Sequence, residues 1–172
     1  YPEFSGGGSE RHPDFTFDVG KESTYQYLNT ILGEVADLFP AQYIHLGGDE
    51  VHFGNEQWKT NDSIQLLMKR ERLERLVDVE HYFMRRMAKQ LEKLDKKLAG
   101  WDESIESGIS NQGALVYWWR HDKEAQLDHA LSKQYDIILC PRLPMYFDFL
   151  QDTTHTNGRK WDGIAPIEDV YN

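Results

Sequence analysis

The sequence lacks three features that would indicate particular classes of protein. Its 172 residues include one cysteine, Cys140, so the chain cannot form an internal disulfide. It has no continuous apolar run of about 18 residues, the minimum for a membrane-spanning helix, and its mean hydropathy is −0.68. Basic residues are scarce, with 19 Lys and Arg against 29 Asp and Glu and a formal net charge of −10. Proteins that bind nucleic-acid phosphates have the opposite balance, so we expect no nucleic-acid partner and no membrane span.

The pattern of apolar residues indicates alternating strands and helices. Residues 1–20 are rich in Gly, Pro and charge and predict a loop. Apolar spacings of three and four predict three helices: 24–39, with Ser23 or Thr24 as N-cap; 62–97, broken near Arg72; and 123–134, with Leu127, Ala130 and Leu131 facing inward. Short β-prone runs predict four strands, over 43–46, 97–101, 115–119 and 136–140. This alternation indicates an α/β domain with a parallel sheet and crossover helices.

The first predicted strand is followed at once by two carboxylates, Asp49 and Glu50. Functional groups of a parallel sheet collect at the carboxyl ends of its strands, in the loops that follow them. Strand alternation places His45 and Asp49 on one face and the apolar Ile44 and Leu46 on the other. If the apolar pair packs on helices, the polar pair faces the opposite side, as in the wall of a barrel.

Two other interpretations of this segment compete with a catalytic one. The first is a Gly-Gly-Asp turn that carries a solvated acidic pair. The second is a metal site built from His45, Asp49, Glu50 and His52, but these residues lack ligand spacing on a common helix and lack a cysteine pair. We therefore predict no metal, and His45 alone is typical of a hydrogen-bonded core histidine.

Aromatic side chains follow the later strands in the same position. Trp101 ends the second strand, Trp119 ends the third, and Tyr146 and Asp148 follow the fourth with a two-residue spacing that puts them on one side if extended. Trp118 has the opposite parity to Trp119 and is interpreted as packing. Aromatic rings stack on the C–H face of a sugar and carboxylates bind its hydroxyls, so this combination favours glycoside hydrolysis.

These residues carry a resemblance to a known family. The segment His45-x-Gly47-Gly48-Asp49-Glu50 resembles the catalytic signature of the family 20 glycoside hydrolases, the β-N-acetylhexosaminidases. Further motifs occur in the order of that family: 38–40, Trp58, 100–103, 116–120 and 146–148. The resemblance implies a (β/α)8 TIM barrel, of which residues 1–172 would supply roughly strands 4 to 7 as a single partial catalytic domain, truncated at both ends.

The resemblance also implies a role for each site residue. The reaction would be exo-acting, retaining and substrate-assisted, with an oxazolinium intermediate. The implied catalytic residues are Asp49, which orients the acetamido group, Glu50, the general acid and base, and Tyr146, a donor to the acetamido oxygen. The implied substrate-binding residues are Trp101, Trp119, Asp148 and His45. No cofactor is implied.

The expected partner is a glycan or glycoconjugate with terminal β-linked N-acetylhexosamine, and the residues leave N-acetylglucosamine and N-acetylgalactosamine open. The family usually acts outside the cytoplasm, which implies a periplasmic, secreted or lysosome-like location. The alternative to an enzyme is a catalytically incomplete fragment or sugar-binding module of the same fold. A half barrel leaves two sheet edges unpaired, so we expect the remaining half of the barrel or a partner chain to cover them.

Overall fold

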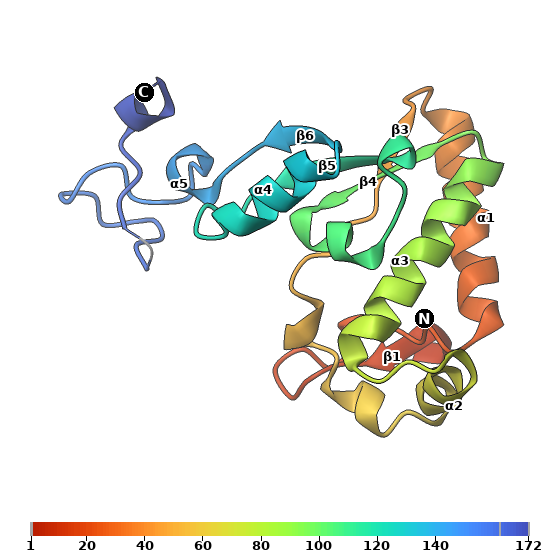
Figure 1. Cartoon of the computed structure of the whole chain (residues 1–172). Coiled ribbons are helices and arrows are strands. Elements are labelled where there is room, and N and C mark those ends of the chain that lie inside the picture. Colours follow the sequence, from red (N-terminus) through yellow and green to blue (C-terminus); the bar gives the residue numbers. More distant parts are fainter. Residues whose placement is uncertain (1, 162, 172) are drawn as a thin grey trace.

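A parallel sheet of four strands forms the centre of the computed structural model, which describes residues 2–161 and 163–171 (Figure 1). The strands are β3 (Tyr43–His45), β4 (Lys97–Trp101), β5 (Ala114–Trp118) and β6 (Asp136–Leu139), in the spatial order β3-β4-β5-β6. All three pairings are parallel, and Trp101 is the register partner of Tyr117. The predicted parallel sheet is confirmed, and β4 begins and ends at the predicted residues.

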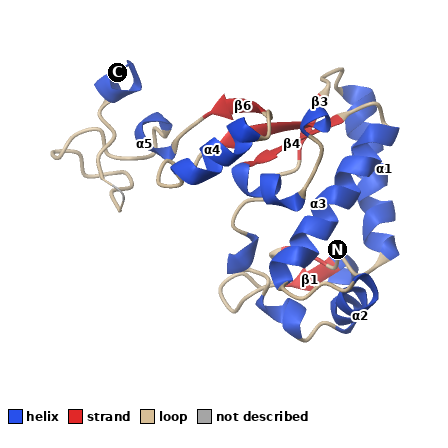
Figure 2. Cartoon of the chain, viewed as in Figure 1, coloured by secondary structure: helices blue, strands red, loops and turns tan. Residues whose placement is uncertain are grey.

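Helices connect these strands and flank them in Figure 2. The α-helices are α1 (Glu22–Leu38), α2 (Asp62–Glu71), α3 (Leu76–Lys93), α4 (Glu124–Ser132) and the short α5 (Arg142–Met145). The predicted break near Arg72 is confirmed, because Arg72 ends α2 with a left-handed backbone, at φ 55°. Residues after α5 form an irregular segment that extends away from α1 and α3 (Figure 1). None of the helices in the described part of the chain is both long and apolar enough to cross a membrane.

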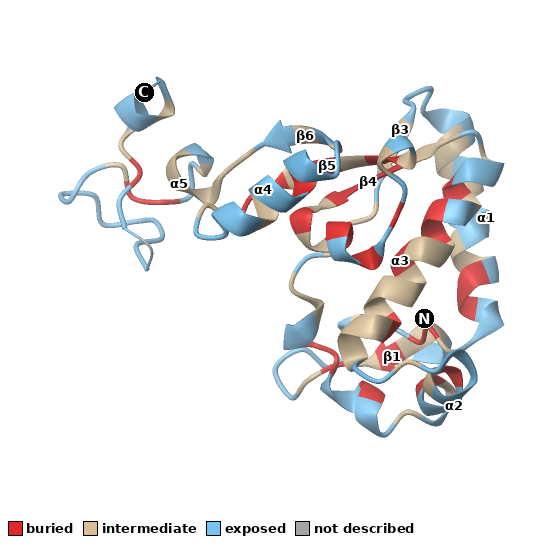
Figure 3. Ribbon diagram, viewed as in Figure 1, coloured by how far each residue is buried: buried red, intermediate tan, exposed pale blue. Residues whose placement is uncertain are grey.

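The main core lies where α1 and α3 pack against one face of the sheet (Figure 3). Its buried side chains include Tyr25 and Leu32 of α1, Met87 and Leu91 of α3, and Leu98 of β4. Ile44 and Leu46 pack against this cluster, as the strand alternation predicted. A smaller cluster joins Ala130 of α4 to Val116 of β5 on the same face. We call this the helix face of the sheet. The opposite face, which carries Trp101 and Tyr117, is called the site face.

The prediction of a loop over 1–20 is wrong in part. Residues Ser5–Gly7 (β1) and Thr16–Phe17 (β2) form an antiparallel pair. The Thr16 hydroxyl donates to the Gly7 carbonyl at 2.7 Å, and the Trp58 indole N–H donates to the same hydroxyl at 2.8 Å. The pair is too short to produce a hydrophobic period, and its contact with Trp58 spans 42 residues of sequence.

Two details of the predicted helices are also wrong. Helix α1 begins at Glu22 with Lys21 as N-cap, so neither Ser23 nor Thr24 caps it. The Thr24 hydroxyl is instead buried and donates to the Asp18 carbonyl at 2.7 Å. On α4, Ala130 is fully buried while Leu131 is 58% exposed. The small Ala130 side chain packs against β5, and the neighbouring Leu131 points away from the sheet.

Candidate active site

The chain turn after β3 positions the two predicted carboxylates. The Leu46 N–H donates to the Ala99 carbonyl at 2.9 Å, and the Trp101 N–H donates to the Gly47 carbonyl at 3.0 Å, so Gly47 remains beside Trp101. Gly47 and Gly48 then adopt φ values of 74° and 94°, in the left-handed region that favours glycine. Helix α3 lies close behind, since a Cβ on Gly48 would be 3.2 Å from the Met84 methyl carbon.

Four rings cluster on the site face at the ends of β3, β4 and β5. The His45 ring lies edge-on to Trp101 and Tyr117, with ring centroids 5.1 and 4.9 Å apart. Trp101 is in turn edge-on to Trp119, with centroids 6.4 Å apart and an interplanar angle of 70°. The structure therefore brings together three of the predicted substrate-binding residues. Tyr117, which has the parity of Trp119, was missed although strand alternation could have identified it.

His45 is held as a neutral imidazole. Its Nδ1 accepts the Gly47 N–H at 3.1 Å, so the ring proton lies on Nε2. Desolvation lowers the pKa of His45 below 6.5, and the negative charge of Asp49 opposes this effect. His45 is therefore hydrogen-bonded, with its N–H donor on Nε2. The prediction of a core histidine is wrong, because His45 is exposed at the end of β3.

An ion-pair network joins the end of β4 to the end of β5. The Arg120 Nε donates to Asp102 Oδ2 at 2.8 Å, and Arg120 Nη1 lies 3.6 Å from Glu103 Oε1. Trp119 Nε1–H donates to Glu103 Oε2 at 3.1 Å. Burial, followed by the negative charge of Asp102, raises the pKa of Glu103 to about 7. The network thus connects a fully buried carboxylate to one of the site-face rings.

Asp49 and Glu50 line different pockets. Asp49 borders a largely apolar pocket of about 330 Å³ beneath Gly47 and Gly48. Glu50 borders a polar pocket of about 380 Å³ that also contains Glu103 and Arg120. The two predicted catalytic carboxylates, consecutive in the chain, thus border different pockets.

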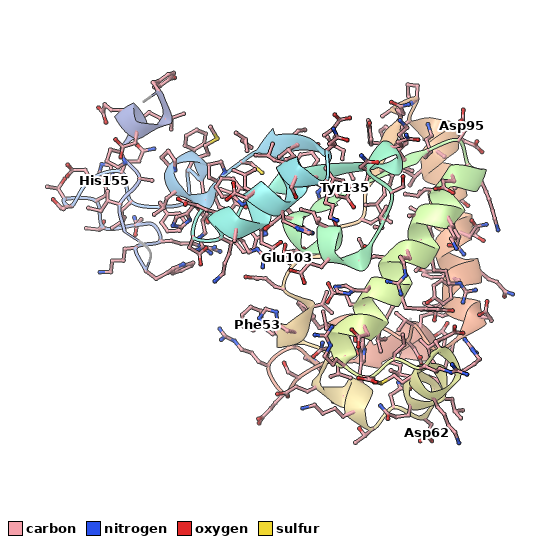
Figure 4. All side chains as sticks on the ribbon, viewed as in Figure 1. Phe53, Asp62, Asp95, Glu103, Tyr135 and His155 are labelled. Atoms are coloured by element: carbon pink, nitrogen blue, oxygen red, sulfur yellow. The ribbon has the colours of Figure 1, made fainter. Side chains whose placement is uncertain are left out.

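Glu80 of α3 lines both of these pockets and was missed by sequence reasoning. Burial, followed by the negative charges of Glu103 and Asp49, raises the pKa of Glu80 to about 7. The sequence carried a signal for it, because Glu80 lies four residues after Leu76 and three before Phe83, on the apolar stripe of the helix. In the view of Figure 4, Glu103 is drawn between the sheet and the loop that carries Phe53.

Tyr146 and Asp148 follow β6 on the segment after α5. Burial raises the pKa of the Tyr146 phenol, and the negative charges of Asp49 and Asp148 contribute to the increase, so both carboxylates interact with it. Asp148 Oδ2 accepts from Arg159 Nε at 3.0 Å. The Asp148 carboxylate is therefore engaged within its own loop rather than directed only at the site. Trp118 points to the other face, where its indole N–H donates to the Lys123 carbonyl at 3.3 Å.

Metal binding has no geometric support within the described residues. No group of three or more His, Cys, Asp or Glu side chains in 2–161 and 163–171 is arranged to hold a metal ion. The chemistry available at the strand ends is that of carboxylates, a phenol, a neutral imidazole and aromatic rings.

Comparison with known proteins identifies the relatives of this chain. Residues 3–172 match the model of the family described as "Glycosyl hydrolase family 20, catalytic domain". The chain is 31% identical over 154 residues to a beta-hexosaminidase of Porphyromonas gingivalis, covering 89% of this chain and 19% of the relative. It is 32% identical over 149 residues to a beta-hexosaminidase of Vibrio furnissii, covering 86% of this chain and 24% of the relative. The chain thus spans a quarter or less of these relatives.

A solved structure has the same fold. The exo beta-N-acetylglucosaminidase of Vibrio harveyi, determined in complex with N-acetylglucosamine, superposes with a TM-score of 0.82 and 30% sequence identity. The superposition covers 96% of this chain and 26% of that one. Together with the parallel sheet, this similarity confirms the predicted fold class, a (β/α)8 barrel of which these residues form a part.

Proposed function

The chain belongs to glycosyl hydrolase family 20 as part of its catalytic domain, and we propose that the protein containing it removes terminal β-linked N-acetylhexosamine from glycans or glycoconjugates. The observation that carries this proposal is the ring cluster of His45, Trp101 and Trp119 at the carboxyl ends of adjacent strands, beside Asp49. Rings in this arrangement form an apolar wall for a pyranose, and neighbouring carboxylates accept its hydroxyl and amide protons. The names of the relatives support the same substrate class.

The proposed reaction retains configuration and uses the substrate as its own nucleophile. The carbonyl oxygen of the 2-acetamido group attacks the anomeric carbon while the bond from that carbon to the leaving oxygen breaks. Glu50 donates a proton to the leaving oxygen, and an oxazolinium ion forms. Glu50, now a carboxylate, takes a proton from water as that water attacks the anomeric carbon. The oxazolinium ring opens, and the released sugar has the same anomeric configuration as the substrate.

Two further residues would act on the acetamido group. Asp49 accepts its N–H, which orients the carbonyl oxygen and stabilises the positive charge that develops on the ring. Tyr146 donates its phenolic O–H to the acetamido oxygen. The raised pKa of Tyr146 keeps the phenol protonated as a donor at neutral pH.

The remaining predicted residues would bind the sugar. Trp101 and Trp119 wall the ring, and the Nε2–H of His45 donates to a hydroxyl. Asp148 accepts a hydroxyl proton and stays paired with Arg159, which orients the carboxylate.

Completion of the site would require additional strands. β3 and β6 are the edge strands of the sheet formed by the described residues. An open sheet exposes unpaired backbone N–H and C=O groups along its edge strands, and parallel sheets are normally covered on both faces. We propose that further barrel strands from the same protein, or from a partner chain, cover these edges and supply the rest of the pocket. The second candidate function, a sugar-binding module that does not catalyse, follows if those strands are missing.

The test is Glu50→Gln in the full-length protein, assayed with aryl N-acetylglucosaminide and aryl N-acetylgalactosaminide. Loss of general acid–base catalysis should lower kcat by about 10² to 10⁴. The control is Glu56→Gln, which changes an exposed glutamate on the same loop and should leave turnover intact. Near-normal turnover in Glu50→Gln would refute the assignment. Binding of N-acetylglucosamine without hydrolysis by the unmodified protein would favour the sugar-binding module.

A further inference from the structure

The hydrogen bond from Trp119 to Glu103 is supported by ion pairs of Arg120 with Glu103 and Asp102. Asp102 is fully buried, and its Oδ2 accepts from Arg120 Nε at 2.8 Å. Arg120 also reaches Glu103, with Nη1 3.6 Å from Oε1, while the other oxygen of Glu103 accepts the Trp119 N–H at 3.1 Å. The contacts form a chain from Asp102 through Arg120 and Glu103 to the indole ring.

Packing alone leaves the plane of Trp119 weakly determined. Trp101 contacts Trp119 edge-on, and the Arg142 guanidinium carbon lies 5.2 Å from its ring centroid. Such contacts tolerate rotation of an indole about its long axis. The N–H bond to Glu103 is directional, and because Trp119 is only 8% exposed, its N–H needs a protein acceptor.

Asp102 makes Arg120 a rigid anchor. A buried carboxylate without its cation is strongly unfavourable, so the Arg120 guanidinium is held in place by the charge behind it. The planar guanidinium can contact two carboxylates at once, a geometry that lysine does not reproduce. Glu103 is thereby held from one side by Arg120. Glu103 is itself largely removed from water, and this burial is the main reason that its pKa is raised to about 7.

We propose that Glu103 is a positioning residue that fixes the plane of Trp119 for stacking on the sugar, and that Arg120, anchored on Asp102, fixes Glu103. The inference rests on the proposed function in that Trp119 binds the sugar. The proposal assigns a role to Asp102 and Glu103, which follow β4, and to Arg120, which follows β5. These three side chains need not contact the reacting atoms.

The test compares Glu103→Leu with Glu103→Gln in the full-length protein. Leucine removes the acceptor, whereas glutamine keeps a carbonyl oxygen that can accept the indole N–H. We expect Glu103→Leu to raise KM for an aryl N-acetylhexosaminide about tenfold with a smaller change in kcat, and Glu103→Gln to stay within about threefold. The control is Glu124→Gln, which changes an exposed glutamate in the first turn of α4, outside both pockets, and should leave KM unchanged.

A double-mutant cycle with Trp119→Phe separates positioning from a general structural role. If Glu103 acts through Trp119, Glu103→Leu should change KM little further in the Trp119→Phe background. The fluorescence difference between wild type and Trp119→Phe isolates the emission of Trp119, and Glu103→Leu should shift that emission. If Glu103→Leu does not fold, Glu103→Asp provides the same test, because the shorter side chain withdraws the acceptor while keeping the charge.

Additive effects in the cycle, or unchanged KM and emission in Glu103→Leu, would overturn the positioning role. Absence of hydrolysis by the unmodified full-length protein would overturn the proposed function instead. In that case the emission of Trp119 still tests the contact with Glu103, so the two failures remain distinguishable.

Discussion

Asp49 and Glu50 are consecutive in the chain, yet they line two different pockets on either side of the turn after β3. Glu50 adopts a left-handed backbone, with φ 52° and ψ 24°, and the chain passes from extended to a 3-10 turn over Val51–Phe53. Glu80 of α3 borders both pockets and connects them electrostatically. In the proposed reaction Asp49 acts on the acetamido group and Glu50 on the leaving oxygen, so each substitution removes a different contact to the same transition state.

Asp49→Asn should reduce catalysis much more than binding. The proposed carboxylate gains most when positive charge develops in the transition state, and asparagine cannot supply that charge. We expect kcat to fall about 10²-fold on an aryl N-acetylglucosaminide, with an inhibition constant for N-acetylglucosamine that changes by less than about threefold. Equal losses in the two measurements would make Asp49 a binding residue only.

Arg120→Met should destabilise the protein strongly. The substitution leaves the fully buried Asp102 carboxylate without its cation, at a cost of about 3 to 5 kcal/mol in the free energy of unfolding. The double variant Asp102→Asn/Arg120→Met removes the unpaired charge and should recover part of that loss. Urea unfolding of the full-length protein measures both effects. A double variant no more stable than Arg120→Met would contradict this explanation.

Glu80 should make stability depend on pH. Its pKa is raised from 4.5 to about 7, so the folded state holds a proton that the unfolded state has already released. The contribution of Glu80 to the free energy of unfolding is therefore largest below pH 4.5. This contribution falls by at most about 3 kcal/mol as pH rises towards 7.

Glu80→Gln should flatten that decline, and thermal unfolding of the full-length protein between pH 4.5 and 8 measures the slope. Glu92→Gln is the matched control, because it changes an exposed glutamate of the same helix. An unchanged slope in Glu80→Gln would show that another group controls the decline.

Substitution by alanine should stabilise the protein at Gly33 and destabilise it at Gly100. Gly33 lies inside α1, and a Cβ added there would have no atom within 4 Å, so Gly33→Ala should stabilise by about 0.5 to 1 kcal/mol through helix propensity. A Cβ on Gly100 would lie 2.9 Å from Ser104 Oγ and 3.3 Å from the Gly47 carbonyl oxygen. Gly100→Ala should therefore destabilise by about 1 to 3 kcal/mol. Chemical denaturation of each variant distinguishes the signs.

Local patterns predicted the sheet and its two faces well. Strand β4 was predicted to the residue, and the alternation that separates Ile44 and Leu46 from His45 places the apolar pair on the core. The same alternation assigned Trp118 to packing, and its N–H binds the Lys123 carbonyl on the helix face. These features depend on a period of two residues, which the chain carries wherever it is extended.

Contacts between distant segments could not be predicted in this way. The β1–β2 pair depends on Trp58, and the orientation of Leu131 depends on how closely α4 approaches β5. Helical spacing puts Glu80 on the apolar stripe of α3, but the raised pKa of Glu80 could not be predicted, because the charges of Glu103 and Asp49 that contribute to it belong to other elements.

The sequence by itself determined the family, through the resemblance of its motifs, and it determined the parallel sheet and the residues at its strand ends through apolar periodicity. Only the tertiary structure decided which of those residues touch. It placed Asp49 and Glu50 on the borders of different pockets, and it joined Asp102, Arg120 and Glu103 behind Trp119. The physical reason is that burial and charge interactions depend on distances between elements, which a one-dimensional pattern does not contain.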